Sequence, residues 1–224
     1  MKILVVAPHP DDELLGCGGT LLRRQAEGAE VGWLLVTAIA PGNGNGWGTD
    51  RIGLRRQEIE QVRQGLGVLP QHMFELGFPT TRLDELRATD LVNRFSQVFS
   101  DFQPDEVLLP HAHDIHSDHR IVFNAACACT KWFRYPSVKR VLSYETLSET
   151  DFVLKPEGVF LPTSYVDISL FMERKLALMR CYPSELGKHP FPRSETALRA
   201  LAQLRGAQSG FEYSEAFQLL RERL

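Results

Sequence analysis

Two short segments of the 224-residue chain concentrate side chains that can bind a metal ion. The first reads APHPDDE at residues 7–13, and the second reads HAHDIHSDHR at residues 111–120. The second segment holds four of the seven histidines in the chain. A catalytic zinc ion takes about three imidazole or carboxylate ligands from the protein and keeps one position for water. The two segments together therefore predict a metal site.

The histidines and aspartates of these segments divide into metal ligands and groups left free beside the metal. His9, Asp12 and His119 would supply two nitrogens and one oxygen, a set that suits zinc, although affinity alone also allows iron or another divalent ion. Asp11 then keeps a free carboxylate, which can accept a proton from water and later deliver it to a leaving amine. His116, when protonated, could stabilise an oxyanion that forms on an attacked carbonyl.

Two further aspartates of the second segment could act through His116. Asp118 or Asp114 would hold the His116 imidazole in one tautomer and raise its pKa. We therefore count Asp118 among the catalytic residues and expect Asp114 beside the substrate. An aspartate at a helix start, such as Asp11 or Asp12, is most often only an N-cap. The density of histidine and aspartate in both segments favours the metal site over that simpler interpretation.

Each segment directly follows a run of apolar residues that suits a buried strand. The runs are KILVV at residues 2–6 and DEVLL at residues 105–109. In an open α/β sheet, ligands bind beyond the carboxyl ends of the strands, at the point where the topology changes direction. The two segments can therefore meet in space although they lie far apart in the sequence.

The rest of the chain alternates between patterns typical of strands and of helices. This alternation predicts crossover units and a Rossmann-like three-layer α/β fold, with a mostly parallel sheet and helices on both faces. We expect one domain over residues 1–224, whose C-terminal part begins at about residue 138. The predicted strands are 2–6, 31–38, 72–76, 105–109, 138–144 and 165–168, and the predicted helices are 12–27, 51–65, 83–102, 120–133, 170–181, 194–204 and 214–223.

Composition excludes several functional classes. A formal net charge of −3, with 43% hydrophobic and 24% charged residues, is ordinary for a globular domain and gives no electrostatic signature for nucleic acid. The longest uncharged apolar stretch, residues 31–40, is too short for a membrane span, and the acidic residues 11–13 lead us to expect no signal peptide in the first residues. The four cysteines include no C-x-x-C pair, which favours a reducing, cytoplasmic location.

The two segments also resemble the motifs of a known family. Residues 8–13 (PHPDDE) and 116–119 (HSDH) are similar to A-H-P-D-D-E and H-P-D-H of the PIG-L/LmbE-like zinc-dependent N-acetylglucosamine deacetylases. Proline replaces the leading alanine, and serine replaces the proline of the second motif. The resemblance implies the same roles as the ligand chemistry. These are zinc binding for His9, Asp12 and His119, general base and acid for Asp11, and oxyanion stabilisation for His116.

The resemblance implies a reaction and a class of substrate. The enzyme would use Zn²⁺ to remove an N-acetyl group from an N-acetylglucosamine-type amino sugar or its conjugate, releasing acetate and a free amine. Family members are often homo-oligomers. Arg55, in R-x-x-E, resembles a family arginine that contacts substrate, and its simpler interpretation is a solvated helix charge. Trp47, in a segment rich in Gly and Asn, could stack on a sugar ring or anchor its loop on the core.

Two other functions compete with this one. Clusters of His and Asp also build the two-metal sites of phosphoesterases, but these need more bridging carboxylates than the two segments clearly offer. A non-catalytic module that binds a sugar or a nucleotide would explain the expected fold. That function would leave Asp11 and the histidine cluster without a role.

Overall fold

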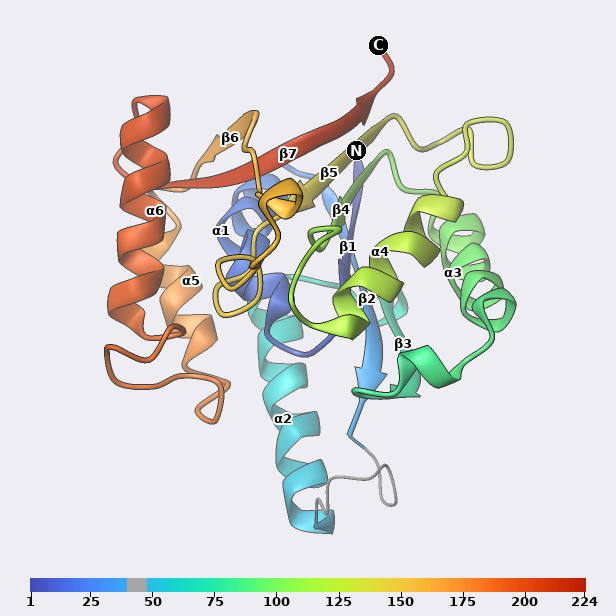
Figure 1. Ribbon diagram of the computed structural model, residues 1–224, viewed down its shortest axis with the longest axis horizontal. Coiled ribbons are helices and arrows are strands. Elements are labelled where there is room, and N and C mark those ends of the chain that lie inside the picture. The colour runs from blue at the N-terminus through green and yellow to red at the C-terminus, as the bar shows by residue number, and fades with distance from the viewer. Residues whose placement is uncertain (40–47) are drawn as a thin grey trace.

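A computed structural model describes residues 1–39 and 48–224 of the chain (Figure 1). Trp47 lies outside these described residues, so its predicted contact with substrate stays a prediction. No helix in the described part of the chain combines the length and apolar character needed to cross a membrane.

One seven-stranded sheet forms the middle of the molecule, in the order β3-β2-β1-β4-β5-β7-β6. The pairs β1–β2, β1–β4, β2–β3 and β4–β5 are parallel, whereas β7 runs antiparallel to both β5 and β6. The central strand β1 is buried along almost its whole length, as expected for an apolar run covered on both faces. The strands are β1 (Lys2–Ala7), β2 (Glu30–Ala38), β3 (Met73–Pro79), β4 (Glu106–Leu109), β5 (Arg140–Tyr144), β6 (Ser164–Asp167) and β7 (Ser214–Glu222).

Helices cover both faces of this sheet, and each face has its own hydrophobic core (Figure 1). Residues of α1, α2, α5 and α6 belong to one core, and residues of α3 and α4 belong to the other. The predicted three-layer α/β fold is therefore confirmed. The helices are α1 (Asp12–Ala26), α2 (Thr49–Gly65), α3 (Ala88–Phe102), α4 (Ser117–Ala128), α5 (Met172–Met179) and α6 (Glu195–Ser209), and the 3-10 turns are Pro70–His72, Leu83–Glu85 and Pro156–Gly158.

The C-terminal segment is a strand, so the predicted helix over residues 214–223 is wrong. Its sequence, SEAFQLLRE in β7, is rich in residues that favour helices. The strand pairs with β5 on one side and β6 on the other, and this buries Ala216 and Phe217 in the sheet. Backbone pairing and side-chain burial that only the folded sheet provides outweigh the local preference.

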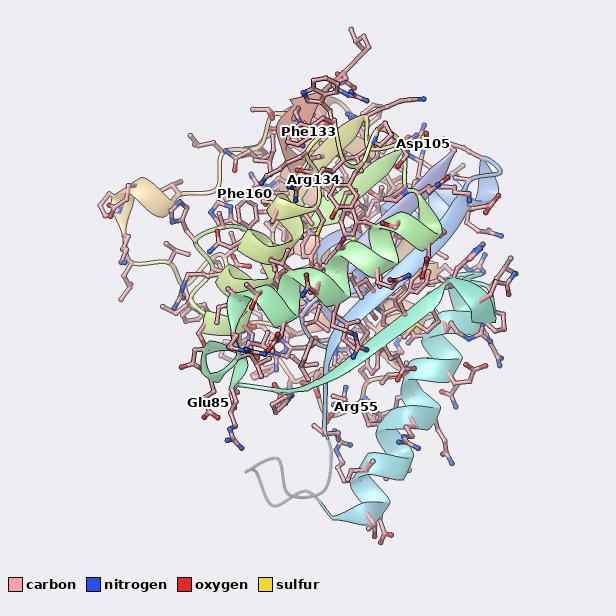
Figure 2. All side chains as sticks on the ribbon, turned by 90° about the vertical axis from the view of Figure 1, so that its right-hand side faces the viewer. Arg55, Glu85, Asp105, Phe133, Arg134 and Phe160 are labelled. Atoms are coloured by element: carbon pink, nitrogen blue, oxygen red, sulfur yellow. The ribbon has the colours of Figure 1, made fainter. Side chains whose placement is uncertain are left out.

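The topology changes direction between β1 and β4, the two strands that carry the metal-binding segments. The two strands are parallel neighbours, with Ile3 opposite Glu106 and Val5 opposite Leu108. The chain leaves β1 toward β2 on one side and leaves β4 toward β5 on the other. In Figure 2, Asp105 before the start of β4 lies at the opposite end of the molecule from Arg55, which lines the cavity described below. Both segments thus leave the sheet at its ligand-binding edge.

Candidate metal and catalytic site

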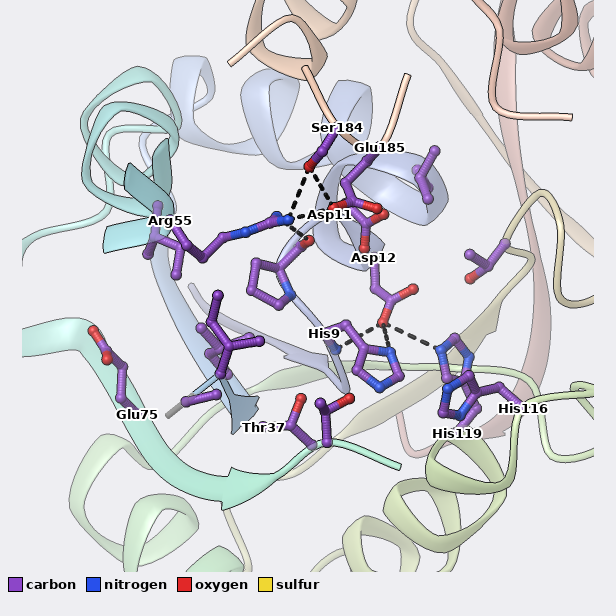
Figure 3. Close-up of a pocket in the computed structure, with 18 of the residues that line it drawn as sticks. His9, Asp11, Asp12, Thr37, Arg55, Glu75, His116, His119, Ser184 and Glu185 are labelled. Atoms are coloured by element: carbon purple, nitrogen blue, oxygen red, sulfur yellow. Dashed lines mark hydrogen bonds and ion pairs between the residues drawn. The ribbon is translucent and has the colours of Figure 1, made fainter. Parts of the chain in front are cut away.

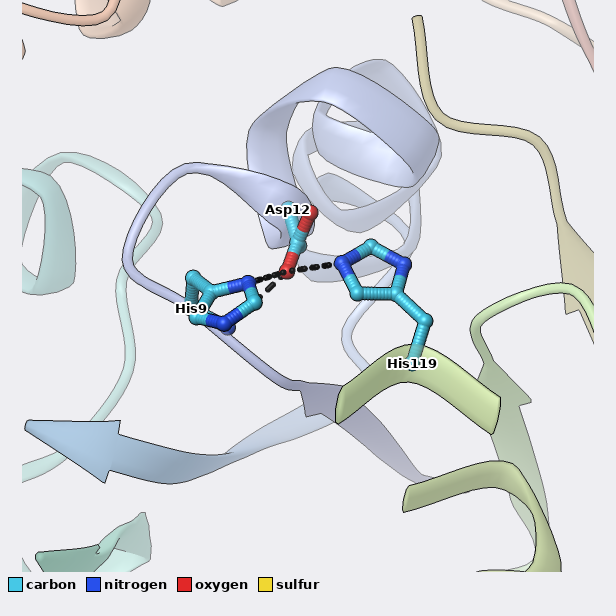
Figure 4. A group of neighbouring side chains, drawn as sticks. All are labelled: His9, Asp12 and His119. Atoms are coloured by element: carbon cyan, nitrogen blue, oxygen red, sulfur yellow. Dashed lines mark hydrogen bonds and ion pairs between the residues drawn. The ribbon is translucent and has the colours of Figure 1, made fainter. Parts of the chain in front are cut away.

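His9, Asp12 and His119 converge beyond the ends of β1 and β4 (Figure 4). One Asp12 oxygen, Oδ2, lies 3.4 Å from His9 Nδ1 and 3.2 Å from His119 Nε2. The possible ligand atoms of the three residues all lie within 4.8 Å of one another. His9 comes from the turn between β1 and α1, Asp12 is the first residue of α1, and His119 comes from the first turn of α4. The sequence prediction brought together these same three residues.

The electrostatics of this group suit a cation. Burial would raise the pKa of Asp12, but attraction to His119 and hydrogen bonds to both histidines lower that pKa well below its usual value. Burial would lower the pKa of His9, but hydrogen bonds to Asp118 and Asp12 raise it to about 9. Burial would likewise lower the pKa of His119, but attraction to Asp12 and hydrogen bonds to Asp114 and Asp12 raise it well above its usual value. Since metal binding displaces ligand protons, a divalent cation can replace the positive charge of the two histidines, and the donor set fits such an ion.

A second carboxylate lies behind each of the two histidines that could bind a metal, His9 and His119. Asp118 Oδ2 lies 3.0 Å from His9 Nε2, and Asp114 Oδ2 lies 2.8 Å from His119 Nδ1. Both aspartates are fully buried. A carboxylate on the far nitrogen fixes the orientation of a ligand histidine and makes it more basic. The sequence analysis expected Asp118 or Asp114 to hold His116. In the structure their side chains instead contact His9 and His119.

Asp114 lies behind the site instead of beside a substrate. Its other side-chain oxygen accepts a hydrogen bond of 2.6 Å from the Thr150 hydroxyl. It is also absent from the described residues that line the cavity. These contacts indicate a positioning role toward His119 in place of the substrate contact suggested from the sequence.

Replacing Asp114 with asparagine is expected to weaken metal binding about 10–100-fold. The amide oxygen is a weaker hydrogen-bond acceptor than the carboxylate, so it holds the His119 ring less firmly. Competition with a chromophoric chelator measures the affinity. The matched variant Asp84→Asn, at an exposed position, should bind metal like the unmodified protein. Equal affinity in both variants would argue against the orienting role.

His116, the residue just before α4, carries its proton on Nε2 when the ring is neutral. Its Nδ1 accepts the backbone N–H of Asp118 at 3.1 Å and so caps α4, which leaves Nε2 as the protonated nitrogen of the neutral ring. Burial and the nearby charges of His9 and His119 lower the pKa of His116 to about 4. The structure therefore supports a neutral hydrogen-bond donor here, whereas the sequence analysis expected an imidazolium.

Asp11 has a strained backbone and a free side chain. Its φ of 133° is rare for any residue other than glycine, and its side chain makes no capping hydrogen bond. Its N–H donates to Glu13 Oε2 at 3.0 Å, while Glu13 Oε1 accepts from the Tyr182 hydroxyl. Such strain is typical of functional sites. Burial and the charge of Asp12 raise the pKa of Asp11 well above its usual value, as suits a group that both accepts and returns a proton.

A break in α1 separates the first part of this helix, which follows Asp11, from the rest. Cys17 has non-helical backbone angles, and beyond it the N–H groups of residues 19 and 20 donate to the Glu215 carboxylate at 2.8 and 2.7 Å. Lys175 Nζ donates to the same carboxylate at 2.7 Å and to the Leu15 carbonyl at 3.0 Å. This buried ion pair satisfies backbone groups on both sides of the break.

Replacing Glu215 with leucine is expected to lower the free energy of unfolding by about 3–5 kcal/mol, because the variant leaves Lys175 as a buried, unpaired charge. Chemical denaturation measures the change. The control Glu212→Leu lies at an exposed position two residues before β7 and should change stability little. If both variants are equally stable, the pair does not hold the break.

A cavity of about 760 Å³ opens onto these groups (Figure 3). Asp11, Asp12 and His116 lie in its wall, and so does Arg55, as the sequence analysis expected of a substrate contact. The Arg55 guanidinium is ion-paired with Glu185 and lies 3.2 Å from Glu58. Because Arg55 lines the cavity and pairs with two carboxylates, it is not simply a charged side chain in solvent on the surface of α2.

Sequence analysis missed several residues of the cavity wall. Arg193 donates to the Ser148 hydroxyl at 2.7 Å and to the Glu185 carbonyl at 3.0 Å. Glu149 also lines the cavity, and burial raises its pKa. Arg193 lies in the proline-rich segment HPFPRS, and Ser148 and Glu149 follow β5, so none of the three belongs to either of the two motifs.

Comparison with known proteins agrees with this geometry. The PIG-L family, described as GlcNAc-PI de-N-acetylase, matches residues 4–130, which include both metal-binding segments. The chain belongs to the PIG-L family. As a PIG-L member it is an amide hydrolase of the deacetylase type.

Several proteins are similar to this PIG-L member over most of its length. Diacetylchitobiose deacetylase of Thermococcus kodakarensis is 28% identical over 232 residues, covering 98% of this chain and 83% of the relative. The uncharacterized deacetylase YaiS of Escherichia coli K12 is 32% identical over 152 residues, covering 65% of this chain and 74% of the relative. The structure of N,N'-diacetylchitobiose deacetylase from Pyrococcus horikoshii aligns with a TM-score of 0.78 and 25% identity, covering 98% of this chain and 84% of the other.

Proposed function

We propose that this chain is a zinc-dependent deacetylase of N-acetylglucosamine-type amino sugars or their conjugates. The observation that carries the proposal is the convergence of His9, Asp12 and His119 in a cavity wall, with the uncommitted carboxyl of Asp11 beside them. Two imidazoles and one carboxylate suit zinc, and each imidazole is held by a second carboxylate. When bound, zinc supplies Lewis acidity, which makes water more acidic and polarises a carbonyl.

The chain's own groups account for the proton movements of amide hydrolysis. Asp11 takes a proton from water at its carboxylate as the new C–O bond forms. Asp11 then delivers this proton to the nitrogen as the C–N bond breaks, so that a neutral amine leaves and the products are acetate and a free amino sugar. The raised pKa of Asp11 favours the second of these transfers. His116 donates from Nε2 to the oxygen on which negative charge develops.

The substrate class rests on the relatives and on the wall of the cavity. The family description and the name of the Thermococcus relative both contain an N-acetylated glucosamine. Arg55 lies in the wall and is proposed to bind a substrate hydroxyl. The described cysteines form no disulfide, which supports a reducing, cytoplasmic location. A homo-oligomer stays a prediction.

Neither competing function accounts for the site as well. Among the described residues, two groups could hold a metal, and both use His9, with no carboxylate common to the two. The bridging carboxylate that would suit a two-metal phosphoesterase is therefore not present there. A non-catalytic binding module would give no reason for the strained backbone of Asp11.

A panel of N-acetylated sugars and nucleotide sugars tests the proposal. The zinc-loaded protein should release acetate and a fluorescamine-reactive amine in equal amounts from at least one N-acetylglucosamine conjugate. Hydrolysis of a phosphate ester without any amine release would contradict it and favour the phosphoesterase.

A further inference from the structure

The cavity extends beyond the metal site into an apolar arm between α2 and β2. We define this arm by Leu35 of β2 and by Ile52 and Ile59 of α2, all of which line the same cavity as the metal-binding residues. In Figure 3, Arg55 and Glu75 lie on the opposite side of the cavity from His116 and His119. The arm is on the Arg55 side, so it lies away from the group that reacts.

Helix α2 turns apolar side chains toward this arm. Ile52 and Ile59 are seven residues apart, which places them on one face of the helix two turns from each other. Both are half-buried, whereas Val62 further along α2 is fully buried in the core. Leu54 of the same helix is 52% exposed and does not line the cavity. Ile52 and Ile59 therefore present aliphatic surface to the cavity, whereas Leu35 is only 1% exposed and belongs to the core beneath it.

The chemistry of the arm distinguishes among the groups that could fill it. A second sugar ring would need hydrogen-bond partners for its hydroxyls, because burying an unpaired hydroxyl costs free energy. The three aliphatic side chains that define the arm provide none. Thr37, which also lines the cavity, already donates its hydroxyl to the Pro8 carbonyl at 2.8 Å. The charged side chains of Arg51, Arg56 and Glu75 also line the cavity, and those of Arg56 and Glu75 lie at its solvent-exposed side.

We propose that the arm binds an apolar aglycone, an alkyl or aryl group attached to the amino sugar. The inference rests on the proposed deacetylase function, because it assumes that the sugar lies between the metal site and Arg55. The cavity volume of about 760 Å³ lies in the upper part of the range typical of pockets for drug-sized ligands, which leaves room for such a group.

A series of N-acetyl-β-glucosaminides tests the arm through kcat/KM. The hexyl glycoside should exceed the methyl glycoside about tenfold or more, because each buried methylene strengthens binding several-fold. N,N'-diacetylchitobiose, in which the aglycone is a second sugar, should fall below the hexyl compound. A hexyl-to-methyl ratio near one, or a preference for the disaccharide over the hexyl glycoside, would overturn the proposal and leave the deacetylase function intact.

Three variants of α2 locate the effect. Ile59→Ser and Ile52→Ser should each reduce the hexyl-to-methyl ratio at least threefold, because a hydroxyl replaces the aliphatic surface. The matched control Leu54→Ser, at the exposed position on the same helix, should keep the ratio of the unmodified protein. Thermal unfolding identifies any variant that does not fold. If the ratio is the same in all folded variants, the aglycone does not bind in the arm.

Binding of hexyl β-glucosaminide, which carries no acetyl group, separates this proposal from the proposed function. Calorimetry should show that the hexyl compound binds at least tenfold more tightly than its methyl counterpart, and Ile59→Ser should remove most of the difference. This result without any deacetylation in the series would overturn the deacetylase function and keep the arm as an apolar binding site. Equal binding of the two compounds would overturn the arm.

Discussion

Replacing Asp11 with asparagine is expected to lower kcat about 10²–10⁴-fold, the usual contribution of a general acid–base group. The amide keeps the size of the side chain but cannot accept a proton from water at neutral pH. Asp11 is not part of the cluster formed by His9, Asp12 and His119, so the variant should retain its metal. Steady-state kinetics and metal analysis of the same preparation measure both properties.

The matched control for this variant is Asp90→Asn, a partly exposed aspartate in the first turn of α3. It should keep both turnover and metal. An Asp11→Asn protein that has lost its metal would identify Asp11 as a ligand and overturn its assignment as the proton acceptor. A variant with full turnover would place the general base elsewhere in the cavity.

Replacing His119 with alanine is expected to abolish metal binding and to reduce turnover at least as far as the Asp11 variant. The change removes one of three ligands and leaves Asp114 and Asp12 as buried carboxylates without their shared partner. A ligand that binds only the folded state raises stability, by about 2.7 kcal/mol at 100 times its Kd. The unmodified protein should therefore melt at a higher temperature with zinc than without it, and His119→Ala should not.

The control His113→Ala removes an exposed histidine from the same segment and should keep the zinc-dependent rise in melting temperature. An equal rise in His119→Ala would show that zinc binds elsewhere. This comparison tests the assignment within the histidine cluster, where sequence alone offers four candidates.

The core of the site could be predicted because it depends on local sequence and on one rule of topology. Parallel strands place their carboxyl ends at the same edge of a sheet, so the residues after β1 and β4 had to meet there. The partners of the aspartates could not be predicted in this way. Asp114 and Asp118 lie close to His116 in the sequence, but the path of the chain into α4 turns their carboxylates toward His119 and His9.

Predictions also failed or fell short where distant segments decide the structure. The composition of β7 favours a helix, and only its pairing with β5 and β6 makes it a strand. Glu185 and Arg193 reach the cavity from the C-terminal part of the chain, where no metal-binding motif indicates a role. Glu215 supports the break in α1 from nearly two hundred residues away, a contact that no local pattern predicts.

The most direct test of a metal-dependent deacetylase is to titrate metal-stripped protein with zinc while measuring acetate release from a responsive N-acetylglucosamine conjugate. Activity should be near zero after chelation and should rise linearly until one zinc ion is bound per chain. In Asp11→Asn the same zinc should bind without restoring turnover. Undiminished acetate release from protein shown to contain no metal would contradict the account.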